Sequence, residues 1–371
     1  MATAFDEDLL QLCWDWLESH LAFFDPRSRE EQYEMAHLKA FDELCLMASL
    51  KPSRQSRTYL NDSVVDFCLD VLGDRPIPDV FVRHLSEFQL LAIPAKLQMK
   101  FSGKSSLREL ILETRNQLPI LSAERLPHRL LDIIYCTESI GLETEVFITR
   151  QALDQTRIAA MQCSNLSLGV CPIKSTLADF YAFTHTIFFL TQFGSTNKSL
   201  GISRSKLIRL THITELAMLR FLADGNQDIV AELLWSLIML DAPKGAAFVV
   251  AGTIVAASIK INGYLAGPQL IESLPVSEND RMTYLNYHST LLACGLLSQG
   301  MMHTVSAQLS IQGRAMRDLA ITPFIELGAS IREMANKHPL ERIEMAQRVA
   351  QLAISIEPLR PEWGEIIARS S

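Results

Sequence analysis

Tyrosine and histidine recur four positions apart in two strongly apolar segments of the 371-residue chain. In FYAFTHTIFFLTQFG, Tyr181 precedes His185, and in YLNYHSTLLACGLLS, Tyr284 precedes His288. Residues four apart lie on one face of an α-helix, so each pair would present a phenol beside an imidazole. Histidine exchanges a proton near neutral pH. The two imidazoles are therefore candidates for general acid/base catalysis.

Other side chains share the helical face of the first segment. At about 100° of rotation per residue, Tyr181, His185 and Gln192 fall within about 40° of one another. Thr184 lies about 60° from Tyr181 on the same count. Phe188 would place an aromatic wall beside this polar stripe.

The stripe allows two interpretations. Buried imidazole, phenol and amide groups cost free energy unless each finds a partner, so the stripe is either a satisfied core network or the lining of a cavity. In the functional interpretation His185 and His288 are catalytic, and five further residues bind the substrate: Tyr181, Thr184, Phe188, Gln192 and Tyr284. In the structural interpretation, tyrosine hydroxyls and backbone carbonyls satisfy both histidines in the core. A separation above about 15 Å would exclude one small substrate shared by both.

Tyr33 and His37 repeat the spacing a third time near the N-terminus. Charged residues surround this pair: Glu30, Glu31, Glu34 and Lys39. Such a run is typical of a helix face in water. We therefore expect no part of the site in this stretch.

Spacing gives little support for a metal site. HExxH is absent from the sequence, and the ExxH of carboxylate-bridged di-iron bundles occurs only at Glu34 to His37. His128 and Asp132 are four apart, a spacing more typical of a surface ion pair than of half a metal site. The seven cysteines are scattered without a CxxC pair, which argues against a cysteine-held zinc ion. We expect no metal.

Organic cofactors and diphosphate substrates lack their motifs as well. Asp228 and Glu232 are four apart in NQDIVAELLW, a spacing that does not match the second metal motif of isoprenoid cyclases, and neither DDxxD nor DxDD occurs. The glycine-rich loops GxGxxG and GxxxxGK[ST] and the nucleophile motif GxSxG are also absent from the sequence. We expect no cofactor.

Two segments, THTIFFLTQFG and YHSTLL, resemble a family of uncharacterised all-helical bacterial proteins encoded beside specialised-metabolite genes. The resemblance implies a role in specialised metabolism and supplies no substrate. Gln192 stands where the family pattern has an acid, which puts a base or metal ligand at that position in doubt. The matching residues are His185, Phe188, Phe189, Thr191, Phe193, Gly194, Tyr287, His288, Thr290 and Leu291.

Charge and cysteine usage restrict the partners and the compartment. The net charge of −8 argues against binding to nucleic acid or an anionic membrane. The cysteines are odd in number and scattered, which predicts reduced thiols in a cytoplasmic protein. The acidic N-terminus predicts that there is no export signal. The most apolar run, Ala246 to Ser258, is shorter than the ~20 residues that span a bilayer and predicts a buried helix packed closely through Gly252 and Ala256.

Apolar residues recur three and four apart along most of the chain, which predicts an all-α fold of about fourteen helices. Short connections favour antiparallel hairpins, stacked as an α/α toroid or an α-solenoid. The stretch Gln155 to Lys174 is expected to have little helix, and it suggests an N-terminal region, 1–160, and a more hydrophobic region, 161–371, within what could equally be one continuous fold.

Two functions fit these patterns. The first is a biosynthetic enzyme of specialised metabolism that binds a small or peptide-linked substrate between helices and uses histidine acid/base chemistry. The second is a non-catalytic helical-repeat protein that binds a peptide or partner subunit in a groove. The apolar surplus also leaves a homo-oligomer open.

Overall fold

The computed structural model describes residues 4–27, 29–50, 62–73, 77–114, 124–143, 149–195, 200, 202–268, 274–308 and 322–337. These residues form helices and turns and contain no strand, which confirms the all-α fold class. In chain order the helices are α1 (Ala4–Ser19), η1 (Leu21–Phe24), α2 (Glu31–Leu50), α3 (Asp62–Leu72), α4 (Asp79–Arg83), α5 (Phe88–Ser102), α6 (Ser106–Thr114), α7 (Pro127–Ser139), α9 (Arg150–Cys163), α10 (Asn165–Leu168), α11 (Leu177–Leu190), α12 (Arg204–Ala223), α13 (Gln227–Met239), α14 (Ala246–Asn262), η3 (Glu278–Asp280), α15 (Arg281–Ser298) and α17 (Thr322–Asn336).

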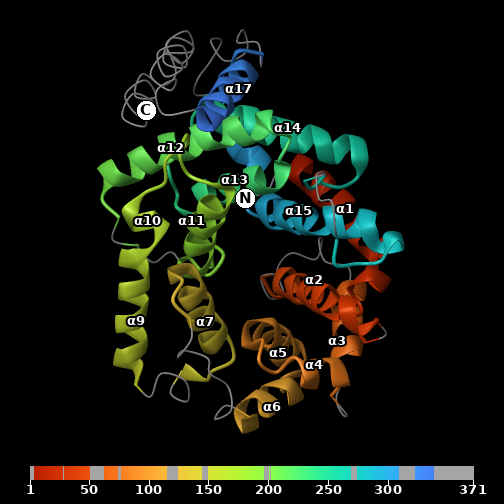
Figure 1. Ribbon diagram of the computed structural model, residues 1–371. Helices are drawn as coiled ribbons and strands as arrows, with labels where there is room; N and C mark the ends of the chain where they lie inside the picture. The colour runs from red at the N-terminus through yellow and green to blue at the C-terminus, as the bar shows by residue number, and fades with distance from the viewer. Residues whose placement is uncertain are drawn as a thin grey trace.

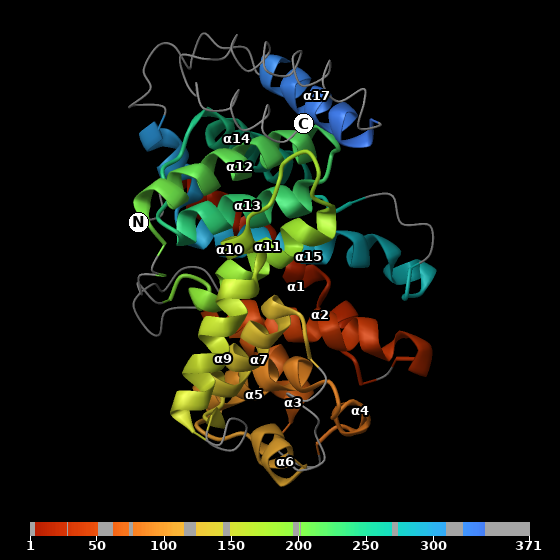
Figure 2. The same ribbon diagram turned by 60° about the vertical axis from the view of Figure 1, so that its left-hand side comes forward.

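Six helices contact one another in a closed circuit. α2 packs on α5, α5 on α7, α7 on α11, α11 on α13, α13 on α15, and α15 returns to α2. In Figure 1, α2, α5 and α7 lie in the lower half of the molecule, and α13 and α15 lie above them. The turned view in Figure 2 shows the same two tiers. The finer expectation of hairpins in an α/α toroid or an α-solenoid stays a prediction, because these contacts establish neighbours and no repeating hairpin.

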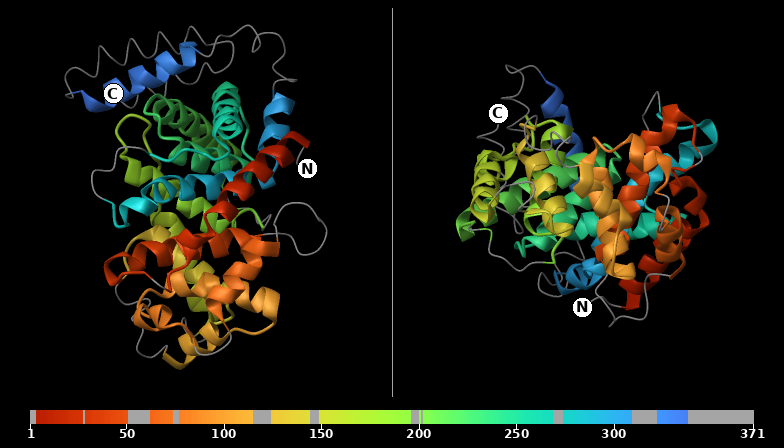
Figure 3. Two further views of the ribbon diagram at one scale, coloured as in Figure 1. Left: turned by 90° about the vertical axis from the view of Figure 1, so that its right-hand side faces the viewer. Right: turned by 90° about the horizontal axis from the view of Figure 1, so that it is seen from below.

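The remaining long helices of the upper tier pack outside this circuit. α12 and α14 pack on α13, α17 packs on α12, and α1 lies against α15 and α14. The left view of Figure 3 shows α1, although it begins the chain, among these late helices. The expected buried helix from Ala246 is α14, and a Cβ atom on Gly252 would lie 2.8 Å from Cγ2 of Val305. This confirms the close packing that the small residue predicts.

Local signals fix the ends of the helices that carry the site. Thr176 and Asp179 cap each other's backbone at the start of α11, and the side chain of Asn226 caps α13. α11 ends at Leu190 because Gln192 and Phe193 adopt left-handed conformations with φ of 49° and 55°. The chain therefore turns back before Gln192, and Phe193 folds against the aromatic residues of α11.

The expected low-helix stretch, Gln155 to Lys174, is wrong for its first part and holds for residues 169–174, which form no helix. Residues 155–163 belong to α9, and α10 follows almost at once. The capped N-terminus at Thr149 starts α9, and its leucine and alanine positions pack it against its neighbours. The division into 1–160 and 161–371 stays a prediction, but three circuit helices come from each side of it. None of the described helices is both long and apolar enough to cross a membrane.

Candidate functional site

Side chains of the six-helix circuit line a partly open cavity of about 210 Å³. Every helix of the circuit contributes side chains to its wall. Carboxylates and histidines gather on part of the wall, and aromatic and aliphatic side chains form the rest. The lining residues are Lys39, Asp42, Glu43, Leu46, Met47, Gln89, Leu90, Ile93, Asp132, Tyr135, His185, Phe188, Phe189, Phe193, Glu232, Trp235, His288, Leu291 and Leu292.

Glu232 is the centre of the polar part. Its side chain is fully buried, and its Oε1 lies 3.5 Å from Nε2 of His185 and 3.5 Å from Nε2 of His288. The two nitrogens are thus separated by no more than twice that distance, so one small substrate can reach both. Burial opposes the charge on Glu232, but the charge of His185 and hydrogen bonds from both imidazoles lower its pKa below the ordinary value.

Hydroxyl groups donate hydrogen bonds to the other oxygen of Glu232 and to both oxygens of Asp228, which together form an acidic pair on α13. Thr184 donates a hydrogen bond to Oε2 of Glu232. Tyr181 donates to Oδ2 of Asp228 over 2.7 Å, and Ser289 donates to Oδ1 over 2.7 Å. Tyr181 and Thr184 therefore position carboxylates from behind the cavity wall; they are absent from the residues that line it.

His288 connects Glu232 with a carboxylate from the other end of the chain. Its Nδ1 lies 2.9 Å from Oε2 of Glu43, whose other oxygen lies 3.7 Å from Nζ of Lys39. Burial disfavours the charged imidazole, but Glu43 and then Asp228 raise the pKa of His288 well above 6.5. For His185, the charge of Glu232 likewise outweighs burial and raises the pKa. In both histidines the neighbouring carboxylates favour the protonated form.

Asp132 is a further carboxyl group of the cavity wall, and its pKa is shifted in the opposite direction from that of Glu232. Burial raises its pKa to about 6, and its Oδ1 receives a weak hydrogen bond from Sγ of Cys136 over 3.3 Å. His128 does not form the expected surface ion pair with it. The His128 ring lies 6.2 Å from the His185 ring, and burial, together with the charge of His185, lowers the pKa of His128 to about 4. The shared helical face points into the protein because α7 packs between α5 and α11.

Two polar atoms of cavity-lining residues are buried without a hydrogen-bond partner. They are Oδ1 of Asp42 and Nε1 of Trp235. Burial and the charges of Glu43 and Asp132 raise the pKa of Asp42 well above its ordinary value. Unsatisfied buried polar groups are costly to the fold, and both of these belong to side chains of the cavity wall.

The structure separates the sequence-predicted residues into three groups. His185, His288 and Phe188 line the cavity as expected, while Tyr181 and Thr184 act through Asp228 and Glu232. The remaining two predicted residues, Gln192 and Tyr284, are not among the residues that line the cavity. Gln192 follows the end of α11 and lines a separate hollow of about 40 Å³. Tyr284 packs against Tyr287, with ring centroids 5.8 Å apart.

The expectation of a solvated helix near Tyr33 holds for only part of the run. Glu30, Glu31 and Lys39 are exposed, but α2 lies between α5 and α15, and Glu34 and His37 are buried. His37 is fully buried with Nδ1 2.7 Å from the carbonyl oxygen of Phe23, and Glu34 pairs with Arg83. Farther along the same helix, Glu43 and Asp42 reach the cavity. The charge pattern alone could not predict that these residues line a cavity, because a polar cavity wall and a solvent-exposed surface both contain charged residues.

Asp228, Glu232 and His288 are the side chains of the described residues that could hold a metal ion. Each offers one atom, and these atoms lie within 4.8 Å of one another. Asp228 already accepts a hydrogen bond at both oxygens, and Glu232 accepts one from Thr184. These oxygens therefore already have hydroxyl or imidazole partners, and any ion here would share them.

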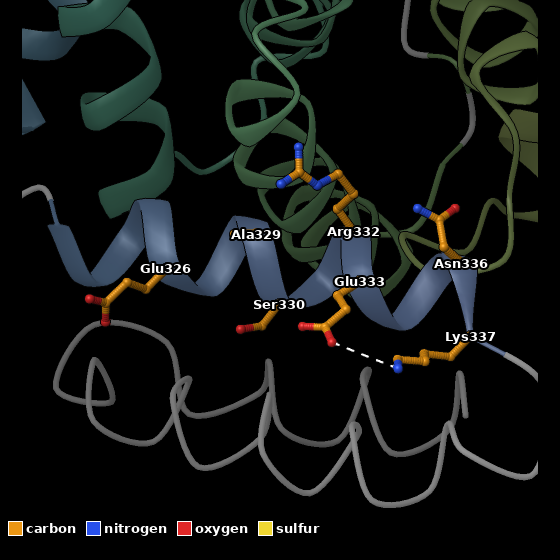
Figure 4. Close-up of a pocket in the computed structure, with 7 residues that line it drawn as sticks. All are labelled: Glu326, Ala329, Ser330, Arg332, Glu333, Asn336 and Lys337. Atoms are coloured by element: carbon orange, nitrogen blue, oxygen red, sulfur yellow. Dashed lines mark ion pairs between the residues drawn. The ribbon is translucent and has the colours of Figure 1, made fainter.

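A second hollow follows the outer face of α17 and is lined there by residues of this one helix. Figure 4 shows these side chains, among them the ion pair of Glu333 and Lys337, with Nζ and Oε1 3.9 Å apart. No histidine is among the described residues that line it. The chemistry of the described residues is concentrated in the circuit cavity.

A family model described as "Domain of unknown function (DUF6895)" matches residues 10–298. The chain belongs to this family. The matched span ends with α15 and includes all six helices of the circuit, so the family is defined by the part of the chain that builds the cavity. No curated protein and no solved structure matches the chain.

Proposed function

We propose that this protein is a cytoplasmic bacterial enzyme of specialised metabolism that transforms a small or peptide-linked substrate in the circuit cavity by proton transfer. The observation that carries the proposal is the shared, buried carboxylate of Glu232 between His185 and His288 at a cavity wall. Titratable groups with shifted pKa values in an enclosed cavity are typical of active sites.

The charges assign roles to the groups. Raised pKa values favour the protonated forms of His185 and His288, which serve as general acids. Their side chains keep 37% and 31% of their surface exposed. Asp132, with a pKa of about 6, is mostly ionised at neutral pH and serves as general base. Groups whose environments push their pKa values apart can supply both an acid and a base in one site.

Glu232 and Glu43 act through the histidines. Each carboxylate fixes one imidazole and balances its charge, as Oε1 of Glu232 does for both Nε2 atoms and Oε2 of Glu43 does for Nδ1 of His288. Tyr181 and Thr184 hold the acidic pair behind them. The histidines then need no reorientation when a substrate enters, which is the advantage of a preorganised site.

The alternative is a helical-repeat protein that binds a peptide in a groove. That function needs a long open groove and histidines packed fully into the core. Here the histidines border a partly open cavity of about 210 Å³, a size that suits a small molecule better than an extended peptide, and this favours the enzyme.

The test is untargeted mass spectrometry of a small-molecule extract incubated with the parent protein, with His185→Gln and with His288→Gln. We expect the parent to deplete at least one compound and His185→Gln to lose 10²-fold or more of that rate, about what a general acid contributes. Equal profiles for all three proteins would refute the proposal. Circular dichroism checks that each variant is folded.

A further inference from the structure

The charges that line the cavity are unevenly paired. Glu43 is paired with His288 and Lys39, and Glu232 is paired with both histidines. Asp42 and Asp132 have no cationic partner in any ion pair of the described residues. The cations of the wall are already paired with Glu43 and Glu232, so the carboxyl groups of Asp42 and Asp132 are left for a cationic ligand to pair with.

The two unpaired carboxyl groups face one space. Asp42 comes from α2 and Asp132 from α7, and both line the cavity. Oδ1 of Asp42 is buried without a partner, and Oδ1 of Asp132 has a weak thiol donor in Cys136. Burying a carboxyl group without a good partner costs free energy. A ligand that brings a positive donor would remove that cost.

Aromatic rings form the neighbouring wall. Trp235 lies 5.1 Å from Phe188 and 5.9 Å from Phe193, measured between ring centroids, and Phe193 lies 5.4 Å from Tyr135. Faces of such rings attract organic cations and accept apolar groups. An anion would meet the surplus carboxylates, and a strongly hydrated inorganic cation would gain nothing from the rings.

The volume limits the size of the ligand. A dry cavity of about 150 Å³ holds benzene. The circuit cavity, at about 210 Å³, therefore suits one ring with a short side chain.

We propose that the cavity binds a small organic amine, with its ammonium group between Asp42 and Asp132 and a body of about one aromatic ring against Trp235 and Phe188. This deepens the proposed function by naming the substrate class of the same site, and it rests on that function only for the claim that the ligand is transformed.

Three probes of one shape test the charge. 2-Phenylethylamine, 2-phenylethanol and phenylacetate carry a cation, a neutral hydroxyl and an anion on similar bodies. In isothermal titration calorimetry at neutral pH, the amine should bind at least tenfold more tightly than the alcohol, and phenylacetate should show no binding. Equal affinity for amine and alcohol, preference for phenylacetate, or no binding of the amine would each overturn the proposal.

Variants locate the ammonium group. Asp42→Asn should weaken amine binding at least tenfold and leave the alcohol unchanged, because only the charge is lost. Asp132→Asn should also weaken amine binding. Asp66→Asn is the matched control, since Asp66 is exposed on α3 away from the cavity, and it should bind the amine as the parent does. Unchanged affinity in both cavity variants would contradict the placement.

The outcome is separable from that of the proposed function. His185→Gln should still bind the amine while losing turnover, because binding needs the carboxyl groups and turnover needs the acid. Amine binding without turnover in any extract would overturn the enzyme and keep the ligand class. Turnover of a substrate without amine binding would overturn the ligand class and keep the enzyme.

Discussion

His185 and His288, from helices far apart in the sequence, direct their Nε2 atoms to the same oxygen of Glu232, each at 3.5 Å. α11 and α15 are not neighbours in the chain. They reach one cavity because both pack on α13, and α15 also packs on α2. A buried carboxylate with an imidazole on two sides stays ionised and keeps both imidazoles charged.

Glu43→Gln should destabilise the fold in a defined pH window. The raised pKa of His288 gives a contribution that is present below pH 6.5 and lost as the pH rises through its folded value. The pKa of Glu43, lowered from 4.5 to about 2, gives one that is present above pH 4.5 and lost toward pH 2. We expect the largest loss, roughly 1.5 to 3 kcal/mol, between these limits.

Thermal midpoints of Glu43→Gln and the parent across this range provide the measurement. Glu31→Gln is the control, because Glu31 is exposed on the same helix. A difference between parent and Glu43→Gln that does not change with pH would show that the pair with His288 does not form.

Gly295→Ala should disturb the aromatic wall. A Cβ atom at this position of α15 would lie 2.3 Å from Cη2 of Trp235, whose ring is buried and cannot move freely. Overpacking of this kind costs about 1 to 3 kcal/mol. Chemical denaturation measures the loss, with Ser298→Ala as control because its hydroxyl donates within the same helix. A variant as stable as the parent would mean that Trp235 packs elsewhere.

The hydrogen bond from Tyr181 to Asp228 should be measurable by a double-mutant cycle. Tyr181→Phe leaves Oδ2 of the buried carboxylate without this donor and should cost about 1 to 3 kcal/mol. Asp228→Asn should make the tyrosine change cheaper, because the pair is then already weakened. Additive losses, determined from urea unfolding of the four proteins, would place the two residues out of contact.

Chelation should leave the protein unchanged. Because Asp228 accepts hydroxyl donors at both oxygens, dialysis against EDTA is expected to keep the thermal midpoint and the turnover. Elemental analysis of the purified protein checks the starting state. One equivalent of a divalent metal, lost together with turnover, would instead assign Asp228, Glu232 and His288 as ligands and remove His288 as an acid.

The sequence predicted the all-α fold, the buried helix α14 and both cavity histidines, because helical periodicity is local and a polar residue on an apolar helix is conspicuous. It could not predict which helices close the circuit. Asp42 and Glu43 come from a helix rich in charges, and Asp132 has a spacing typical of surface pairs, so only their tertiary neighbours show them facing a cavity.

Gln192 shows a second limit of periodicity. The rotation of 100° per residue extends a helical face only as far as the helix lasts. α11 ends at Leu190, and the left-handed backbone at Gln192 and Phe193 turns the amide away and brings the phenyl ring inward. The apolar pattern of the sequence continues past Leu190, because Phe193 is also a buried core residue.

The most direct test of the account is the rate at which the parent and His185→Gln deplete amines from one extract at neutral pH, followed by derivatisation of amino groups and mass spectrometry. The account predicts that an amine of about one ring disappears with the parent and persists with the folded variant. Depletion of no amine, or equal depletion by both proteins, would contradict it.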